Sequence, residues 1–186
     1  RRQRQMCIRD SSYISILPFN ELGAAAVAYY SDVNTLKMLD EIYSAAKAPF
    51  EIRNGSEKVT RRFFKISEST SRCFTEKYKR LIEEGLCRGH QCIAYGLYMR
   101  DCGIELSQGL AVYGYSICSA IVTNCVKLVP LSQIAGQRIL GESFEFISSA
   151  AEKAVFTDIN DIGISGAGFD LRAMEHERLY SRQYMS

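Results

Sequence analysis

The sequence predicts an all-α fold: a single-domain helical bundle of about six or seven helices around a buried central helix. The chain has 186 residues, a usual length for one domain, and 47% of them are hydrophobic, so it can bury a sizeable core. Only 3 residues are proline, which leaves long windows that favour helices over many short strands. Apolar residues recur at helical spacing, whereas strict alternation of apolar and polar residues does not extend over any useful length.

Four helices are predicted in the first half of the chain, at residues 17–30, 33–47, 50–68 and 70–84. Pro18 suits the first turn of a helix, where its missing N–H group would have no partner. Asp32, after Ser31, can cap the second helix, and Pro49 ends it. Gly85 is expected as the C-cap of the fourth helix, because glycine readily adopts the left-handed conformation that ends many helices.

The central helix is expected between Glu105 and Leu128, after a helix at 90–102 that Gly103 ends. Residues 106–126 carry no charged side chain, and this stretch of 21 residues has the length of a membrane span. Serine, threonine, glutamine and asparagine interrupt it, however, so we interpret it as a core helix that its neighbours bury on most sides. No membrane partner is expected.

The last third of the chain is predicted to hold a long helix at 133–156, a loop at 157–168 and a short helix at about 170–179. Ser132 is expected as the N-cap of the long helix, whose apolar residues form one stripe. Glycine, asparagine and aspartate residues mark the loop.

The first eleven residues differ from the rest of the chain. Four of the first ten are arginine, and the segment has neither a helical nor a strand period. It resembles the translation of a sequencing adapter, and blocks of charge are also typical of tails. Residues 1–11 are therefore interpreted as a non-native or disordered tail.

Charge and residue counts argue against several classes of protein. With 23 basic and 21 acidic residues, the net charge of +2 lacks the basic excess of a nucleic-acid-binding domain, so no nucleic-acid partner is expected. Two histidines are too few for a metalloenzyme with several histidine ligands. Seven cysteines, an odd number, favour reduced thiols in the cytoplasm. The polar start of the chain lacks the apolar region of a signal peptide.

One group of residues has the chemistry of a metal site. Cys87, His90 and Cys92 lie within six residues, with Cys102 one helix downstream, and such ligands suit zinc or nickel. The spacing differs from a C-x2-C pair, and no second pair supplies a fourth ligand, so these are weak candidates. The alternative is a loop cysteine, a capping histidine and a core cysteine. The sequence contains no phosphate-binding glycine loop, and we assign no catalytic residue.

Two blocks of sequence resemble a known family. Residues 127–140, KLVPLSQIAGQRIL, follow the pattern K-x-V-P-L-x-Q-x-x-G-Q-x-x-L, and residues 174–182, MEHERLYSR, follow M-x-H-E-x-x-Y-S-R. In this order, and near the C-terminus, both patterns resemble the urease accessory protein UreF family. The resemblance extends over residues 13–186 and departs from the family at Gln183, where leucine is usual. The family's N-terminal quarter has no counterpart here, so the chain is expected to be N-terminally truncated.

The resemblance implies a function. Members of the family are all-α, cytosolic, non-enzymatic scaffolds that form homodimers. They bind the D/H-type urease accessory protein and together recruit the GTPase UreG, and the assembly delivers nickel to apo-urease. The chain itself is expected to bind no cofactor, because the partner complex handles nickel and GTP. The alternative is a small helical metal- or thiol-binding protein that uses Cys87, His90, Cys92 and Cys102.

The resemblance also implies which residues serve this role. The all-α domain is expected at residues 12–168, and residues 169–186 are expected to form a partner-binding helix and tail. The partner-binding residues are Arg172, Met174, His176, Glu177, Tyr180, Ser181 and Arg182. The turn after the central helix is expected to form a second partner face, with Lys127, Pro130, Gln133, Gly136 and Gln137.

Overall fold

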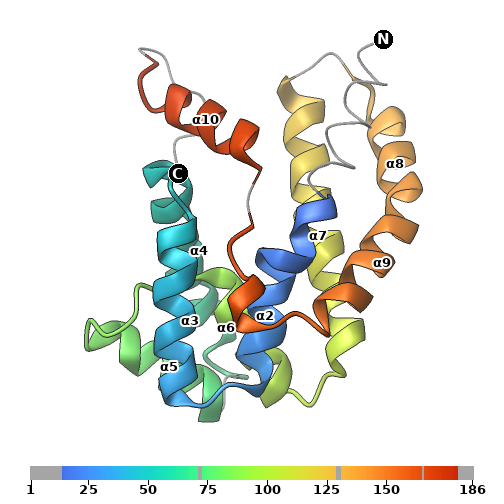
Figure 1. The fold of residues 1–186 in the computed structure, drawn as a ribbon. Coiled ribbons are helices and arrows are strands. Elements are labelled where there is room, and N and C mark those ends of the chain that lie inside the picture. The colour runs from blue at the N-terminus through green and yellow to red at the C-terminus, as the bar shows by residue number, and fades with distance from the viewer. Residues whose placement is uncertain (1–13, 71–72, 129–130, 165, 180–186) are drawn as a thin grey trace.

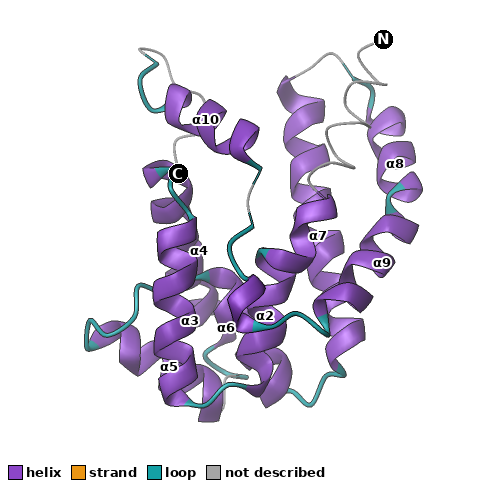
Figure 2. Ribbon diagram, viewed as in Figure 1, coloured by secondary structure: helices purple, strands orange, loops and turns teal. Residues whose placement is uncertain are grey.

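The computed structural model describes residues 14–70, 73–128, 131–164 and 166–179. Within these ranges it contains nine α-helices, two short 3-10 helices and no strand (Figure 1, Figure 2). The prediction of an all-α, single-domain fold is therefore confirmed, with more helices than the six or seven expected. The elements are η1 (Leu17–Phe19), α2 (Glu21–Tyr30), α3 (Val33–Ala46), α4 (Phe50–Ser67), α5 (Cys73–Glu83), α6 (Gln91–Asp101), α7 (Leu106–Leu128), α8 (Gln133–Glu142), α9 (Phe144–Ala154), η2 (Ile159–Asp161) and α10 (Ala167–His176).

Helices α2 and α6 form the centre of the bundle. α2 is rich in alanine, and α6 carries Gly96 where the two helices meet. A Cβ atom on Gly96 would overlap the carbonyl oxygen of Ala25, so the two backbones approach more closely than any larger residue allows. Leu22 of α2 and Leu97 and Met99 of α6 are fully buried in the same core. The fold is thus built on a tightly packed pair of short helices.

Two groups of helices pack on opposite sides of this pair. α3, α4 and α5 lie on one side, and α7, α8 and α9 lie on the other (Figure 1). α10 lies at one end of the bundle, where it contacts α4. None of the residues of α10 is buried, so this helix is the least embedded of the described α-helices.

Four of the predicted helix ends are present as expected. The side chain of Asp32 accepts a hydrogen bond from the N–H group three residues later at 2.8 Å, and Ser132 does the same at 3.1 Å. Gly85 and Gly103 have φ angles of 73° and 67°, in the left-handed region. The N–H group after each glycine bonds back to a carbonyl oxygen of the last helical turn, which ends the helix in a Schellman motif.

The predicted long helix at 133–156 is in fact two helices, α8 and α9. The break falls at Ser143, whose hydroxyl donates a hydrogen bond to the carbonyl oxygen of Leu140 at 2.7 Å. Such a bond competes with the helical ladder and bends the chain. Buried apolar residues continue on both sides of the break, at Leu140 and Ile147, so apolar spacing alone did not predict it.

The long helix α7 is buried along one face only, whereas the sequence led us to expect burial on most sides. Leu110 and Tyr113 are buried against the bundle, but Val112 and Tyr115 are exposed. Among the described residues, α7 is the helix that is long and apolar enough to cross a membrane, yet it packs against α2, α6, α8 and α9. The single chain therefore leaves the outer face of α7 open.

Candidate functional site

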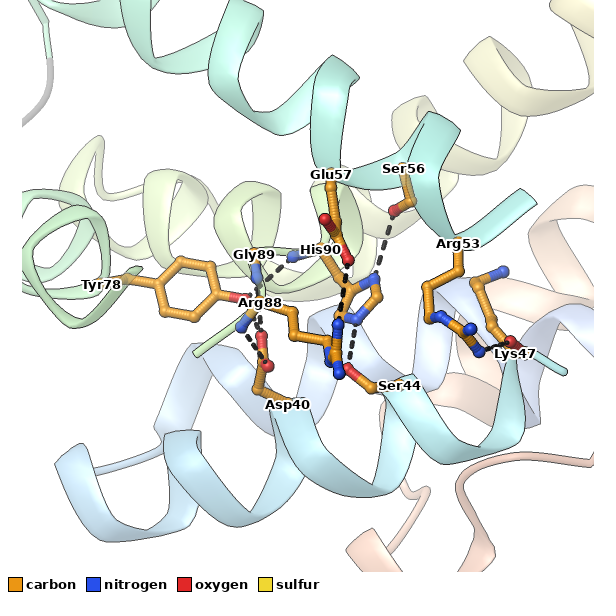
Figure 3. Close-up of polar contacts among 10 residues, drawn as sticks. All are labelled: Asp40, Ser44, Lys47, Arg53, Ser56, Glu57, Tyr78, Arg88, Gly89 and His90. Atoms are coloured by element: carbon orange, nitrogen blue, oxygen red, sulfur yellow. Dashed lines mark hydrogen bonds and ion pairs between the residues drawn. The ribbon is translucent and has the colours of Figure 1, made fainter. Parts of the chain in front are cut away.

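A buried aspartate joins helices α3 and α5 to the loop before α6 (Figure 3). Asp40 accepts hydrogen bonds from the Arg88 and Gly89 N–H groups at 2.7 and 3.1 Å and from the Tyr78 hydroxyl at 2.5 Å. Only 2% of Asp40 is exposed, so these three donors replace the water that its carboxyl group loses on burial. Burial and the nearby Asp40 raise the pKa of Tyr78 well above its usual value, which keeps the phenol protonated as a donor.

His90 extends this cluster to helix α4. Its ring is fully buried, with Nε2 2.7 Å from the Ser44 hydroxyl and Nδ1 3.4 Å from the Ser56 hydroxyl (Figure 3). Its backbone N–H group donates to the Tyr78 hydroxyl oxygen at 3.0 Å, so Tyr78 connects Asp40 with His90. Burial lowers the pKa of His90 to about 4, so the ring is neutral at neutral pH. The cluster therefore joins α3, α4, α5 and the start of α6 without a buried imidazolium.

The Ser44–His90 pair has the spacing of a nucleophile and a base, but not the rest of such a site. A catalytic histidine is usually oriented by an acidic group, whereas the second ring nitrogen of His90 lies nearest to the Ser56 hydroxyl. With a pKa of about 4, His90 is also a weak base at neutral pH. We therefore interpret the cluster as a structural joint between helices.

The structure does not assemble the metal candidates into a site. Both ring nitrogens of His90 face serine hydroxyls, and burial raises the pKa of the Cys87 and Cys92 thiols to about 12. Cys92 and Cys102 lie at opposite ends of α6, about 15 Å apart along its axis. In the part of the chain that the structure describes, no group of three His, Cys, Asp or Glu side chains is placed to hold a metal ion. The alternative hypothesis of a metal- or thiol-binding protein gains no support from this arrangement.

The turn predicted after the central helix lies between α7 and α8. Lys127 is exposed at the end of α7, Gln133 and Gln137 are exposed on α8, and Pro130 lies outside the described residues. Gly136 is buried against α7, where a Cβ atom would crowd a valine side chain, so glycine lets the two helices approach closely. The structure thus brings the described members of this group to one helical hairpin.

The predicted partner-binding helix is α10, which begins and ends about three residues earlier than expected. All ten of its residues are described, and none is buried. Leu171 and Met174 are 62% and 37% exposed, and Leu179 is exposed just beyond the helix. Arg172 is exposed and forms an ion pair with Glu175 at 3.7 Å. Three further predicted residues lie outside the described part of the chain: Tyr180, Ser181 and Arg182.

His176 and Glu177 contact the first turn of α4. His176 Nδ1 lies 2.8 Å from Glu51 Oε2, and the Glu177 carboxylate accepts a hydrogen bond from the Glu51 N–H group at 3.2 Å. The first N–H groups of a helix have no partner within the helix, and Pro49 at the N-cap offers no side-chain acceptor. Glu177 therefore caps α4 in place of a local residue.

A mostly buried ion pair lies close to the start of α10. Lys47, after α3, donates to Glu21 of α2 at 2.9 Å. Burial alone would lower the pKa of Lys47, but Glu21 and, more weakly, Asp170 of α10 raise it above its usual value. Asp170 and Lys47 therefore attract each other electrostatically, and this attraction adds to the interactions between α10 and the bundle.

Comparison with known proteins identifies the family. The sequence profile of UreF matches residues 17–143, which is more than half of the chain. The chain is 33% identical over 178 residues to a protein of Actinobacillus pleuropneumoniae serotype 5b (strain L20), across 95% of this chain and 75% of that protein. The chain belongs to the UreF family. A UreF protein of Paenarthrobacter aurescens (strain TC1) is 31% identical over 150 residues, across 80% of this chain and 67% of that protein.

The UreF assignment agrees with the resemblance found in the sequence. Both relatives are named urease accessory protein UreF, a name that describes an accessory protein and not an enzyme. The matched residues 17–143 include the buried cluster and the α7–α8 turn, and the profile match ends where α8 gives way to α9. α10 lies beyond the profile match but within the 178 residues aligned with the Actinobacillus pleuropneumoniae protein.

Sequence analysis missed the Asp40 cluster, although a signal was present. Asp40 and Ser44 lie on the same helical face as Leu36 and Tyr43, so two polar residues stand on the apolar stripe of α3. Such residues need buried partners. Glu51, by contrast, gave no signal, because its partner His176 is 125 residues away in the sequence.

Proposed function

We propose that this UreF-family chain is a non-enzymatic scaffold of urease maturation. It binds the D/H-type urease accessory protein, and the two together recruit the GTPase UreG for nickel insertion into apo-urease. The chain itself binds neither nickel nor GTP, and it acts in the cytoplasm as a homodimer. Family membership supports this proposal, and the exposure of α10 supports its assignment to the first partner.

The observation that carries the proposal is that α10 contributes no buried residue to the core. α10 buries none of its ten residues, yet it exposes Leu171 and Met174 beside Arg172. A helix of this length is marginal in water unless other elements stabilise it. Arginine and large apolar side chains are frequent anchors of protein interfaces. A partner that covers this face would bury apolar side chains that are exposed in the single chain, and this burial would favour binding.

We assign the outer face of α7 to the second copy of the chain. Val112 and Tyr115 are exposed there, and the Tyr115 ring lies 5.7 Å from the ring of Phe144, which α9 also exposes. Residues 106–126 carry no charge, so two copies can meet on this face without burying ions. A homodimer would therefore cover an uncharged helix face that the single chain leaves open.

Size-exclusion chromatography with light scattering tests the scaffold role. The full chain and a form that ends at Gly166, before α10, are each mixed with a D/H-type urease accessory protein. Circular dichroism first establishes that both forms are helical. We expect the full chain to co-elute with the partner and the shortened form to elute separately from it. Co-elution of both forms would move the interface to the helical body, and co-elution of neither would contradict the proposed function.

A further inference from the structure

Two residues of the proposed partner-binding segment already have partners within the chain. His176 contacts the Glu51 carboxylate at 2.8 Å, and Glu177 accepts the Glu51 N–H group at 3.2 Å. Figure 1 shows α10 lying across the end of α4 where these contacts are made. The same side chains cannot offer the same atoms to a partner protein while these bonds persist.

The first turn of α4 is well suited to hold these two residues. Its N–H groups point out of the helix and lack a local acceptor, because Pro49 occupies the N-cap position. A carboxylate such as that of Glu177 satisfies one of these groups and also interacts favourably with the positive end of the helix dipole. Glu51 then supplies an acceptor for His176 in the same turn.

The contact is also weak enough to open. The side chains of His176 and Glu51 are 36% and 29% exposed, so water competes for both. α10 adds no buried residue that would anchor it further. Contacts with few buried apolar groups belong to the low-stability end of a protein and open locally.

We propose that His176 and Glu177 form a latch, which holds α10 on α4 in the free chain and which the partner must open before it binds these two side chains. The inference rests on the proposed function, because it takes α10 as the partner-binding helix. When the latch is closed in ten molecules of eleven, the apparent affinity of the partner is about tenfold weaker than its intrinsic affinity. Removing the latch then strengthens binding by the same factor.

Limited trypsin digestion without any partner tests whether the latch exists. Mass spectrometry follows cleavage after Arg172 and Arg178, which are both exposed on or next to α10. We expect Glu51→Ala, which removes the acceptor of His176, to be cleaved up to about tenfold faster than the unmodified chain, because cleavage follows the open population. Equal cleavage rates would overturn the latch.

Two control variants show whether charge removal alone changes cleavage. Glu68→Ala removes one carboxylate at the far end of the same helix, and Glu175→Ala removes one from α10 that pairs with Arg172 and not with α4. Both should be cleaved within about twofold of the unmodified chain. Because Glu51 is only partly buried, circular dichroism is expected to show Glu51→Ala folded like the controls. Glu51→Gln repeats the test with the side-chain shape kept.

Titration with the D/H-type urease accessory protein then tests the consequence for binding. We expect Glu51→Ala to bind more tightly, by the same factor as its gain in cleavage rate, and Glu68→Ala to bind like the unmodified chain. Unchanged or weaker binding by Glu51→Ala would overturn the proposal that the partner competes with the latch. If neither form binds the partner, the proposed function fails, while the digestion result still decides whether α10 is latched to α4.

Discussion

A few polar residues inside the bundle hold its helices together through buried hydrogen bonds. Asp40, Tyr78 and His90 form a chain of hydrogen bonds that connects helices α3 and α5 with the loop before α6. In a buried network of this kind, removing one member leaves the others without partners, which costs more than the lost bond itself. Substitutions here should therefore act on stability and not on partner recognition.

Replacing Asp40 by asparagine is expected to lower the free energy of unfolding by about 2–4 kcal/mol. The amide nitrogen cannot accept a hydrogen bond, so it would confront a donor among Arg88 N–H, Gly89 N–H and the Tyr78 hydroxyl. Urea titration followed by circular dichroism measures the change. Glu41→Gln, one residue further on and exposed, is the control and should change stability by less than about 0.5 kcal/mol. Equal stability of the two variants would contradict the role of Asp40.

The buried ring of His90 predicts a loss of stability in mild acid. The pKa of histidine in an unfolded chain is about 6.5, and burial lowers it to about 4 in the folded protein. As the pH falls, the unfolded chain therefore binds the proton first, and stability is lost between about pH 6.5 and pH 4.

Between pH 7.5 and pH 5, we expect the His90 ring to account for a loss of about 2 kcal/mol, measured by urea titration at both pH values. His90→Gln is the matched variant, because its amide can still bond the serine hydroxyls but does not titrate. If His90→Gln lost as much stability as the unmodified chain over this range, His90 would not be the titrating group.

Helix ends were predictable because their chemistry is local. Asp32, Ser132, Gly85 and Gly103 act on backbone groups within a few residues of themselves, so the sequence alone identified them. The break at Ser143 was not predicted, since apolar spacing continues across it. The short helix near the C-terminus was also predicted from the local sequence, although α10 begins and ends about three residues earlier. The partner-binding roles of α10 and of the turn residues stay predictions that rest on the resemblance to the family.

The pairing of elements was less predictable than their positions. The central role of α2 and α6 depends on a close approach at Gly96 that only the folded chain reveals. The uncharged sequence of α7 indicated a helix covered on most sides, because nothing in the sequence shows that one of its faces stays open in the single chain. The latch was missed for the same reason, since Glu51 and His176 meet only in the fold.

A methyl group at the contact of α2 and α6 is expected to destabilise the bundle. In Gly96→Ala the new Cβ atom would overlap the Ala25 backbone, and overpacking of this kind costs about 1–3 kcal/mol or more. Gly141→Ala is the matched control, because a Cβ atom there meets open space within a helix and should stabilise by about 0.5–1 kcal/mol. Thermal unfolding should separate the two variants in opposite directions, and a stable Gly96→Ala would rule out the close contact.

The described part of the molecule combines one closed core with exposed apolar side chains, some of which lie on α7 and α10. The core lies between the α3–α5 and α7–α9 groups, and the outer face of α7 and the exposed face of α10 remain uncovered (Figure 1). Soluble proteins that expose apolar side chains in this way usually bury them against another chain. The proposed function needs one surface for the second copy of the chain and another for the partner protein.

Charge placed on the outer face of α7 should separate the proposed homodimer. Tyr115→Arg puts a cation beside Phe144, where the second copy would have to bury it. Light scattering at a fixed concentration should show a monomer for Tyr115→Arg and a dimer for the unmodified chain. Lys153→Arg, on α9 and exposed, keeps the charge of the surface and should remain a dimer. A dimeric Tyr115→Arg would place the dimer contact on another face.

Hydrogen exchange of the full chain, with and without the D/H-type urease accessory protein, tests most directly whether α10 is the partner-binding helix. The amide groups of Ala167–His176 lie in a helix that no buried residue anchors, so they should exchange quickly in the free chain. On addition of the partner, we predict that exchange in this helix slows more than in any other described helix. Formation of a complex without slower exchange in α10 would contradict this assignment.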